Sequence, residues 1–448
     1  MPFPLSASLE RFGDSAAMVF DHRTFSYREL SEHVAEWRSH LDSCAISRGQ
    51  VVTLEGPCSP QTVAGLLALA ERGAITVPLN NPPAAKRAEY LDVAEAEVTV
   101  TVLPDGSRHT ERTGRTAGHP LYARLRQDGR PGLVLFSSGT TGRSKASLLD
   151  LEKMLARYAA GGPGRRIMSF LSMDHIGGVN TVLHTLSTGG TVVTVSDRTP
   201  DAVLAAVAAH RVQVLPTTPT FLNMVLVSGA AERHDASSLE LITYGTEPMP
   251  QQTLGWLCRG FPQARLKQTY GLSELGILPT KSRGNGELWM KLGGTGFAHK
   301  IADNVLWIRS DMAMLGYLNA PAPFDAEGFF NTEDVVVRDG EWIRVLGRRS
   351  EIINVGGEKV YPSEVESVLL EVPGVAEATV SGHPSPVTGM VVRATLLPAG
   401  EEDTRDLVSR ARRHCRTRLE AYKVPALLTV STAQQHSDRY KKSRAGLS

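Results

Sequence analysis

Apolar and polar positions repeat with two different periods along the first 260 residues. Residues 27–41 and 61–72 carry apolar side chains at helical spacing, which predicts amphipathic helices. Short apolar runs at residues 51–54 and 73–78 predict buried strands. The same alternation of strand and helix returns between residues 189 and 260. It predicts parallel sheets flanked by helices.

The pattern changes twice in the second half of the chain. Residues 285–339 show short apolar runs separated by glycine and aspartate turns, which predicts a barrel-like β subdomain. A second change in the pattern begins near residue 350, after which helices are predicted at 363–370 and at about 404–419. We therefore predict an α/β protein with a large N-terminal domain of two helix-flanked sheets and a β-barrel-like subdomain, residues 1–349. A small mobile α+β domain follows at residues 350–448.

Composition narrows the class of protein. A chain of 448 residues has room for two or three domains, and 42% hydrophobic with 21% charged residues suits a soluble globular protein. A net charge of +1 argues against a nucleic-acid-binding protein, which would carry a basic face. The apolar runs are too short to span a membrane, and the first residues do not resemble a signal peptide. The four cysteines lack paired spacing, which predicts reduced thiols in the cytoplasm.

The most informative segment joins an apolar run, residues 133–136, to a loop of small residues. The loop reads Ser137-Ser-Gly-Thr-Thr-Gly142 and is closed by Lys145. Glycines let the backbone approach a phosphate closely, hydroxyls and turn amides donate hydrogen bonds, and the lysine neutralises charge. The ordinary nucleotide P-loop ends in an adjacent Gly-Lys pair, whereas two residues separate Gly142 from Lys145 here. The sequence therefore predicts a phosphate-binding loop of a different kind.

A second element, Gln268-Thr-Tyr-Gly-Leu-Ser-Glu274, follows a strand-like stretch that ends near Leu266. In its functional interpretation Glu274 is a Mg²⁺ ligand, Ser273 donates to a phosphate and Tyr270 stacks near adenine. One glutamate is enough, because Mg²⁺ takes few carboxylates and completes its shell with phosphate oxygens and water. The alternative is a strand-to-helix turn in which Glu274 is solvated in the first helical turn.

Three further elements follow. Residues 331–350 predict a β-hairpin with its turn at Asp339-Gly340, and Asp334 and Arg348 lie on either side of that turn. Residues 352–366 contain the pair Gly356-Gly357. The basic tail contains Tyr440-Lys-Lys-Ser-Arg444.

Two segments earlier in the chain complete the pattern. Met173-Asp-His-Ile-Gly-Gly178 contains His175, which is either a site residue or a satisfied core histidine. Tyr244-Gly-Thr-Glu-Pro248 follows a predicted strand. Taken together, and in their order along the chain, the elements resemble the motifs of the acyl-adenylate-forming superfamily. This superfamily includes acyl-CoA synthetases, aryl-acid ligases and adenylation domains of peptide synthetases.

The resemblance implies ATP and Mg²⁺ as cofactors and gives each motif a role. Glu274 and Thr141 would hold the metal. Asp334 would accept hydrogen bonds from the ribose hydroxyls, and Arg348 would contact the same ribose. The remaining residues implied at the phosphates, the adenine and the thiol tunnel are Ser137, Ser138, Gly139, Thr140, Thr141, Gly142, Lys145, Ser273, Gly245, Thr246, Glu247, Tyr270, Gly271 and Gly357.

The catalytic residues implied are Lys441, Glu274 and His175. Lys441 would bridge the substrate carboxylate and the α-phosphate, with Lys442 as the competing assignment. His175 would lie as an aromatic gate beside the acid. The family is also expected to rotate its small domain between two half-reactions, exchanging the lysine for the loop around Gly357.

Three positions depart from the family pattern. Glu333 replaces the glycine of Thr-Gly-Asp, Ser350 replaces an Asp or Lys at the hinge, and Tyr440 replaces the glycine before the catalytic lysine. Ile176 occupies a position where amino-acid-activating domains often carry aspartate, and an apolar residue there would leave an ammonium unpaired. Amino-acid substrates are therefore disfavoured, although a shift of one residue would bring in Asp174.

We therefore predict an ATP-dependent ligase that forms an acyl- or aryl-adenylate and passes the acyl group to CoA or to a carrier-protein phosphopantetheine. The predicted partners are a small carboxylic acid and a carrier protein, with no nucleic acid and no membrane. Two alternatives stay open: a ligase with an amine or other nitrogen acceptor, and a degenerate nucleotide-binding protein without turnover.

Overall fold

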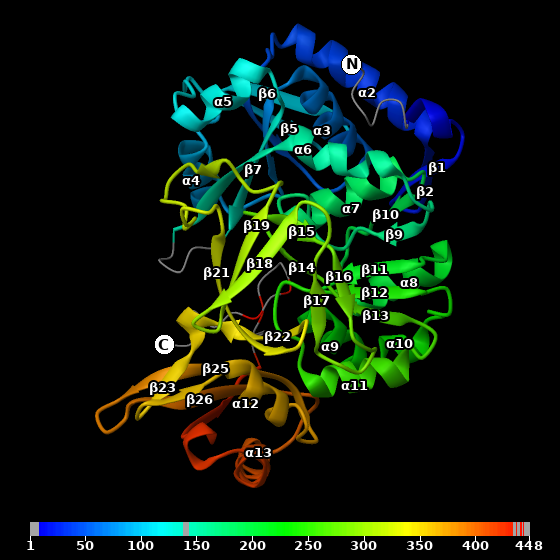
Figure 1. The fold of residues 1–448 in the computed structure, drawn as a ribbon. Helices are drawn as coiled ribbons and strands as arrows, with labels where there is room; N and C mark the ends of the chain where they lie inside the picture. Colours follow the sequence, from blue (N-terminus) through cyan, green and yellow to red (C-terminus); the bar gives the residue numbers. More distant parts are fainter. Residues whose placement is uncertain (1–8, 138–142, 433–435, 437–439, 441, 443–448) are drawn as a thin grey trace.

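The computed structural model describes residues 9–137, 143–432, 436, 440 and 442. A large domain contains two helix-flanked sheets with an antiparallel sheet beside them, and the small C-terminal domain lies against one end (Figure 1). This is the predicted α/β class. Among the described residues, none of the helices has the length and apolar character needed to cross a bilayer.

The first helix-flanked sheet is mainly parallel and has the order β13-β12-β11-β9-β10-β1-β2. Its last strand, β2, runs antiparallel to β1. Its strands are β1 (Ala16–Phe20), β2 (Arg23–Ser26), β9 (Arg166–Met168), β10 (Thr191–Val193), β11 (Val214–Thr217), β12 (Leu241–Tyr244) and β13 (Arg265–Gln268). Its helices are α7 (Ile176–Ser187), α8 (Pro200–His210), α9 (Pro219–Val227), α10 (Ala230–Arg233) and α11 (Gln251–Gly260).

The second helix-flanked sheet has the order β20-β8-β7-β4-β3-β5-β6. Its strands are β3 (Val51–Glu55), β4 (Ile75–Leu79), β5 (Val98–Val102), β6 (Arg108–Arg112), β7 (Gly132–Ser137), β8 (Lys145–Asp150) and β20 (Gly316–Tyr317). The helices of this part are α2 (Tyr27–Ser43), α3 (Pro60–Arg72), α4 (Ala84–Val93), α5 (Pro120–Asp128), α6 (Leu151–Ala156) and the 3-10 helix η1 (Arg157–Ala160).

Local sequence sets the ends of these helices. The Ser59 side chain accepts a hydrogen bond from the amide of Thr62, Pro60 opens α3, and Gly73 ends it with a φ of 70°. A left-handed residue after a helix is favourable for glycine, which has no Cβ. In α2, Ser26 and Glu29 form a capping box.

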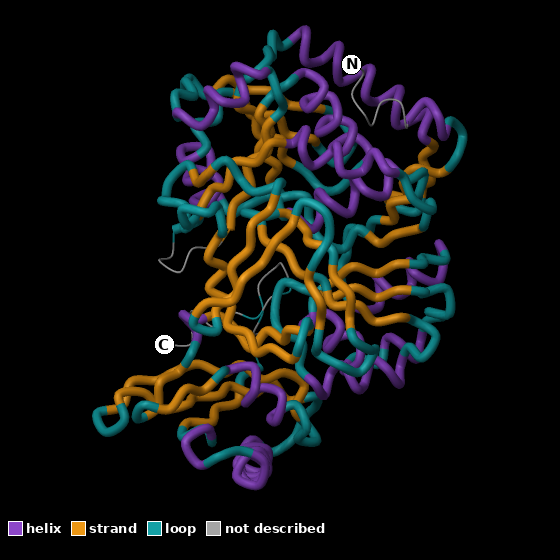
Figure 2. Tube along the Cα trace, in the orientation of Figure 1, coloured by secondary structure: helices purple, strands orange, loops and turns teal. Residues whose placement is uncertain are grey.

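The predicted barrel-like region is an antiparallel sheet of order β16-β17-β22-β21-β19-β18, which curves between the other layers (Figure 2). Its strands are β16 (Thr280–Ser282), β17 (Met290–Leu292), β18 (Phe297–Ala302), β19 (Val305–Ser310), β21 (Phe330–Asp339) and β22 (Trp342–Arg348). The hairpin predicted around Asp339-Gly340 joins β21 to β22, and Gly340 has a φ of 58°. A separate hairpin is formed by β14 (Tyr270–Leu272) and β15 (Gly276–Leu278).

The small domain is a sheet of order β24-β23-β26-β25, with β27 paired to β26. Its own apolar core is built from residues between 353 and 430, but the boundary at residues 349 and 350 stays a prediction. Its elements are η2 (Arg349–Glu351), β23 (Ile353–Val355), β24 (Glu358–Val360), α12 (Pro362–Leu369), β25 (Val375–Ser385), β26 (Gly389–Pro398), α13 (Thr404–Arg418), η3 (Ala421–Lys423) and β27 (Leu427–Val430).

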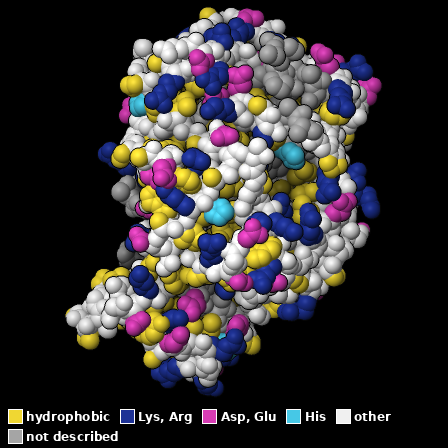
Figure 3. Space-filling model, viewed as in Figure 1, with side chains coloured by type: hydrophobic (Ala, Val, Ile, Leu, Met, Phe, Trp, Pro, Cys, Tyr) yellow, Lys and Arg dark blue, Asp and Glu magenta, His cyan; other side chains and the backbone are white. Residues whose placement is uncertain are grey.

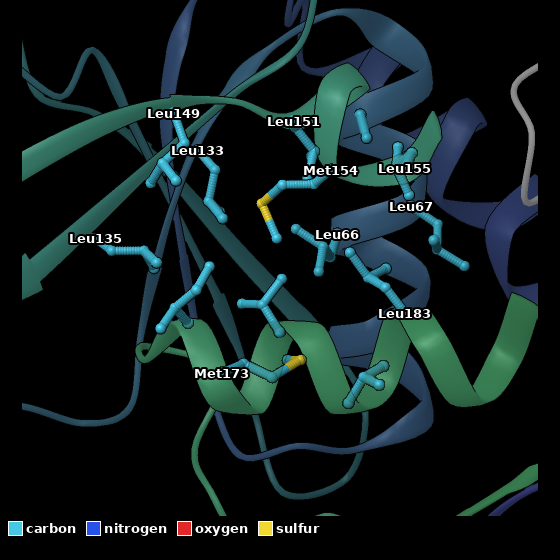
Figure 4. Packing of buried hydrophobic residues seen from close by; sticks show 14 of the residues in the cluster. Leu66, Leu67, Leu133, Leu135, Leu149, Leu151, Met154, Leu155, Met173 and Leu183 are labelled. Carbon is cyan, nitrogen blue, oxygen red and sulfur yellow. The ribbon is translucent and has the colours of Figure 1, made fainter. Parts of the chain in front are cut away.

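The largest core cluster joins the second sheet to the helices that cover it. Figure 4 shows Leu133 and Leu149, from β7 and β8, on the sheet side, with Leu66 of α3, Met154 of α6 and Leu183 of α7 facing them. These contacts fix β7 and β8, the strands on either side of the predicted phosphate loop. On the surface, basic and acidic side chains are interspersed over the face drawn in Figure 3, in keeping with the small net charge.

One local alternative from the sequence is wrong. Residues 268–274 do not lead from a strand into a helix with a solvated glutamate. Glu274 lies in the turn between β14 and β15, where it is 8% exposed. The short antiparallel pair, Tyr270 opposite Leu278, is stabilised by tertiary packing that the local sequence does not show.

Candidate nucleotide and acid site

The predicted phosphate loop connects two adjacent antiparallel strands. Ser137 ends β7 and lies opposite Lys145, the first residue of β8. Residues Ser138, Gly139, Thr140, Thr141 and Gly142 lie outside the described residues. The loop therefore begins and ends at neighbouring positions of the sheet. Lys145 lies at the end of the loop, where the pairing of β8 with β7 fixes its backbone.

A chain of side chains joins this lysine to Glu274. Strand β20 pairs with β8, with Tyr317 opposite Ser147. Lys145 Nζ lies 5.4 Å from the centroid of the Tyr317 ring. The Tyr317 hydroxyl donates a 2.7 Å hydrogen bond to Oε1 of Glu274. Burial raises the pKa of Tyr317 above its ordinary value, and the Glu274 carboxylate adds to this shift, so the phenol stays a donor.

The chemistry around Glu274 suits a hard divalent cation. Tyr317 occupies one carboxylate oxygen, and the second, Oε2, receives no recorded hydrogen bond from the described residues. In the described part of the chain, no group of three or more histidine, cysteine or acidic side chains could hold a metal by itself. Glu274 alone does not fill the coordination shell of a divalent cation, and phosphate oxygens are among the ligands that Mg²⁺ takes at nucleotide sites.

A second carboxylate site is built by the hairpin of β21 and β22. Its register places Asp334 directly opposite Arg348, and the Arg348 Nε atom lies 3.7 Å from Oδ1 of Asp334. The Tyr270 hydroxyl donates to Oδ2 of the same carboxylate. Burial raises the pKa of Asp334 above its ordinary value, against the opposing effects of the Arg348 charge and the Tyr270 hydroxyl.

The structure thus brings together two motifs that are far apart in the sequence. Tyr270 and Glu274 lie at the two ends of one short strand and turn, and Tyr270 carries the contact to Asp334. The charge of Arg348 also interacts with Glu274. The result is a pair of buried carboxylates with one guanidinium beside them.

The loop after β12 packs against the same region. A Cβ on Gly245 would lie 2.6 Å from Oγ1 of Thr269, so only glycine fits at this approach. Thr246 is exposed and has a φ of 73°. Gly271 is equally tight, because its Cβ would lie 2.6 Å from Cδ1 of Ile277. These contacts hold the loop against the strand that leads to Tyr270.

Glu247 and Gly357 make contacts that the sequence did not suggest. Oε1 of Glu247 accepts a 2.8 Å hydrogen bond from the amide of Thr220 at the start of α9. Its Oε2 accepts a 3.2 Å hydrogen bond from the amide of Lys442. Gly357 lies in the β23–β24 turn of the small domain, where its amide donates to Asn354. Its place is therefore on the small domain and not among the buried carboxylates.

The remaining site residues are also located. Ser273 is buried beside Glu274 in the turn. His175 is the N-cap of α7, and its Nδ1 accepts a 3.2 Å hydrogen bond from the amide of Gly177, which places the ring proton on Nε2. Helix α7 packs beside β15, the strand that follows Glu274. Lys441 lies outside the described residues.

Tyr317 is the residue that sequence reasoning missed. It lies 43 positions after Glu274 in the chain and in no recognised motif. The available signal was weak: a tyrosine after Gly316, whose φ of 154° marks an unusual backbone, within an otherwise apolar segment. Only the pairing of β20 with β8 shows why it belongs to the site.

The second glycine after His175, Gly178, leaves no room for a side chain, and this can be tested. A Cβ on Gly178 would lie 2.0 Å from the carbonyl oxygen of Ser172. The Gly178→Ala substitution is expected to displace the start of α7 and lower the stability of the large domain by about 3 kcal/mol, as overpacked sites do. Thermal denaturation checks this.

The control for that substitution is Gly255→Ala in α11. Its nearest contact would be 3.9 Å away, at Nη1 of Arg259, so alanine should be neutral or stabilising by up to about 1 kcal/mol. Wild-type stability of Gly178→Ala would show that the loop before His175 relaxes freely.

Comparison with known families agrees with this geometry. The family model described as AMP-binding enzyme matches residues 5–318, and the model of the AMP-binding enzyme C-terminal domain matches residues 364–436. The chain belongs to this family of adenylate-forming enzymes.

Individual relatives are ligases of carboxylic acids. The chain is 30% identical to indoleacetate–CoA ligase of Aromatoleum aromaticum over 85% of both chains. It is 29% identical to feruloyl-CoA synthase of an Amycolatopsis species, over 89% of this chain and 88% of that one.

A similar fold is found in a solved structure of the anthranilate CoA ligase AuaEII in complex with anthranoyl-AMP. The TM-score is 0.82 at 18% identity, covering 99% of this chain and 96% of the other.

Proposed function

We propose that this enzyme activates an aromatic carboxylic acid with ATP and Mg²⁺ and transfers the acyl group to the thiol of CoA. The observation that carries the proposal is the pair of buried carboxylates, Glu274 and Asp334, arranged around Arg348 beside the mouth of the phosphate loop. One carboxylate has an oxygen available for a cation, and the other has acceptors suited to a ribose.

The chemistry follows from the charges that must meet. A carboxylate is a poor electrophile, so it first attacks the α-phosphate of ATP, forming a P–O bond to the acid and expelling pyrophosphate. Both reactants are anionic, and the site must supply positive charge where negative charge develops. We assign this to Lys441, with Lys145 and the loop amides on the β- and γ-phosphates. A Mg²⁺ ion on Glu274 and Thr141 would neutralise phosphate charge.

The remaining nucleotide contacts are assigned to the Asp334 site and the adjacent loop. Asp334 and Arg348 would hold the ribose, and Ser273 would donate to a phosphate. The adenine wall would be formed by Gly245, Thr246, Glu247, Tyr270 and Gly271. Two of these residues also make hydrogen bonds within the chain: Tyr270 donates to Asp334, and Glu247 accepts from the amide of Thr220. In the second step the thiol attacks the acyl carbon and AMP leaves, with Gly357 lining the path of the thiol.

Aromatic acids are favoured by two lines of support. Ile176 is buried in the core at the start of α7, where it offers no partner for the ammonium of an amino acid. Relatives in this family include indoleacetate, feruloyl, 2-succinylbenzoate and 4-coumarate ligases. His175, at the start of the same helix, is assigned as the aromatic wall beside the acid.

CoA is favoured as the acceptor because these relatives are CoA ligases. A carrier-protein phosphopantetheine presents the same thiol chemistry and is the second candidate, since the chain is also 26% identical to an isonitrile lipopeptide synthase of Streptomyces coeruleorubidus, over 32% of that protein. All four cysteines are free, which fits the cytoplasmic location we propose.

The test is ATP–pyrophosphate exchange with Mg²⁺ across aryl, fatty and amino acids, without an acceptor. Exchange with indoleacetate, ferulate or a related aryl acid is expected. Adding CoA, a phosphopantetheinylated carrier protein or an amine to the active acid then separates the acceptors. Binding of ATP without exchange for any acid would instead indicate a nucleotide-binding protein without turnover.

The Asp334→Asn substitution tests the ribose assignment. Asparagine keeps the size of the side chain and can still accept from Tyr270, but it loses a charged acceptor, which is worth about 1.5–3 kcal/mol. The KM for ATP is expected to rise about 10-fold or more, while the KM for the acid stays unchanged, both measured by exchange kinetics.

A pH series is the internal control for this substitution. Because burial raises the pKa of Asp334, its carboxylate is protonated at a less acidic pH than an ordinary aspartate. ATP affinity of the wild type should therefore weaken as the pH falls into the acidic range, and the asparagine variant should lack this dependence. An unchanged KM in the variant would remove Asp334 from the nucleotide site.

A further inference from the structure

We propose that the C-terminal segment clasps the two domains together in the arrangement used for acid activation, and that Tyr440 and Lys442 are positioning residues for that step. The clasp consists of these two residues and their carboxylate partners Glu247 and Glu366. The inference rests on the proposed function, because Tyr440 and Lys442 flank Lys441 in the sequence and that proposal assigns Lys441 to acid activation.

Tyr440 attaches the segment to the large domain. Its carbonyl oxygen accepts a 2.8 Å hydrogen bond from Oγ1 of Thr218, and its hydroxyl donates over 2.8 Å to the carbonyl oxygen of Arg198. Its ring centroid lies 5.1 Å from that of Phe170 and 5.4 Å from that of Phe221. Phe170 and Thr218 follow β9 and β11, so the ring covers the carboxyl ends of two parallel strands, the edge at which open α/β sheets bind ligands.

The backbone shows that this ring is held in place by its contacts. Tyr440 has a φ of 52°, in the left-handed region that favours glycine. The family motif carries glycine at this position. A tyrosine there is strained, and its three sets of contacts with the large domain offset the strain.

Lys442 attaches the segment to both domains. Its Nζ atom donates to Oε2 of Glu366 and to the carbonyl oxygen of Ala378, each over 2.9 Å. Both acceptors belong to the small domain, and the Glu366 side chain is only 2% exposed. The amide of Lys442 meanwhile donates to Glu247 of the large domain.

Glu366 makes a second contact within the small domain. Its Oε1 accepts a 3.0 Å hydrogen bond from the amide of Val380. Breaking the pair with Lys442 would remove a cation from a buried carboxylate, which is costly. Lys442 is therefore a firm attachment to the small domain.

These attachments are very close together along the chain. Tyr440 and Lys442 are two peptide units apart, so their Cα atoms are separated by about 7 Å at most. Asn223 of α9 also donates a 2.7 Å hydrogen bond to the carbonyl oxygen of Ala376 in the small domain. A rotation of the small domain must break the bonds of Tyr440, Lys442 or Glu247, so the clasp favours the present arrangement over any rotated one.

The consequence differs between the two half-reactions. If the small domain rotates between them, weakening the clasp should slow acid activation and leave thiol transfer as fast as before or faster. A residue with a merely structural role would slow both steps together.

The experiment compares Tyr440→Gly and Lys442→Met with the wild type. Lys423→Met is the matched control, because Lys423 pairs with Glu364 and Glu420 inside the small domain. Three quantities are measured on the full chain: hydrogen exchange of the amide of residue 442, which donates to Glu247, ATP–pyrophosphate exchange with the aryl acid that supports it, and thioester formation from supplied acyl-adenylate and CoA.

Both clasp variants are expected to lose amide protection and to activate the acid about tenfold more slowly, with thioester formation at the wild-type rate or above. Lys423→Met should match the wild type in all three. Unchanged activation in both clasp variants, or an equal loss in both half-reactions, would overturn the positioning role while the proposed function stands. Absence of exchange in the wild type with every acid would instead refute the proposed function, and the positioning role with it.

Discussion

The Glu274→Gln substitution is expected to slow acid activation about 100-fold, because it removes the carboxylate that we propose as the anionic ligand for Mg²⁺ at the phosphates. The substitution is conservative in shape. The amide oxygen of glutamine can still accept the hydrogen bond that Tyr317 donates to Oε1, so the turn between β14 and β15 should keep its structure. ATP–pyrophosphate exchange measured against Mg²⁺ concentration should show that saturation requires much more of the cation.

The control is Glu333→Gln, an exposed carboxylate next to Asp334 that is assigned neither to the metal nor to the nucleotide. It should exchange at the wild-type rate with the wild-type requirement for Mg²⁺. A Glu274→Gln enzyme with full activity and an unchanged Mg²⁺ requirement would show that the metal is held elsewhere.

The Lys441→Ala substitution should slow acid activation about 100- to 1,000-fold. In the role that we propose, Lys441 supplies a cation next to the α-phosphate, where it stabilises charge that develops in the first transition state and has no assigned part in thiol transfer. Thioester formation from supplied acyl-adenylate and CoA should therefore stay near the wild-type rate, and single-turnover measurements of the two steps separate these effects.

Lys442 provides the comparison for this assignment. The sequence left Lys441 and Lys442 as competing choices, and Lys441 lies outside the described residues. The Nζ atom of Lys442 is engaged by Glu366 and Ala378 in the small domain, which favours Lys441 for the catalytic role. A larger loss of activation in Lys442→Ala than in Lys441→Ala would reverse the assignment.

The three departures from the family pattern lie in different structural settings. Glu333 and Tyr440 stand where the family carries glycine, and both have positive φ, at 60° and 52°. Both positions therefore have the left-handed backbone that favours glycine, although neither residue is glycine in this chain. Ser350 lies in the short 3-10 helix η2 between the last large-domain strand and the small-domain core. Its effect on domain rotation stays a prediction.

Several elements were readable from the sequence because they depend on neighbouring residues. The β21–β22 hairpin follows from its turn at Asp339-Gly340, whereas the shift of register between Val335 and Val336, which places Asp334 opposite Arg348, does not follow from that turn. Helices α2 and α3 follow from apolar spacing and from their caps. The order of the motifs was enough to indicate the family and the phosphate loop between Ser137 and Lys145.

Tertiary structure alone decided which of these elements meet. Tyr317 belongs to the Glu274 site through the pairing of β20 with β8, and Lys442 meets Glu366 across 76 positions of the chain. Other contacts also join distant segments. They bury Glu274, link the Tyr270 hydroxyl to Asp334, and pack the Tyr440 ring against Phe170 and Phe221. Local residue preferences fix the backbone over a few residues, and therefore determine elements and motifs. Contacts between distant segments depend on how whole layers pack, and no short stretch of sequence contains that information.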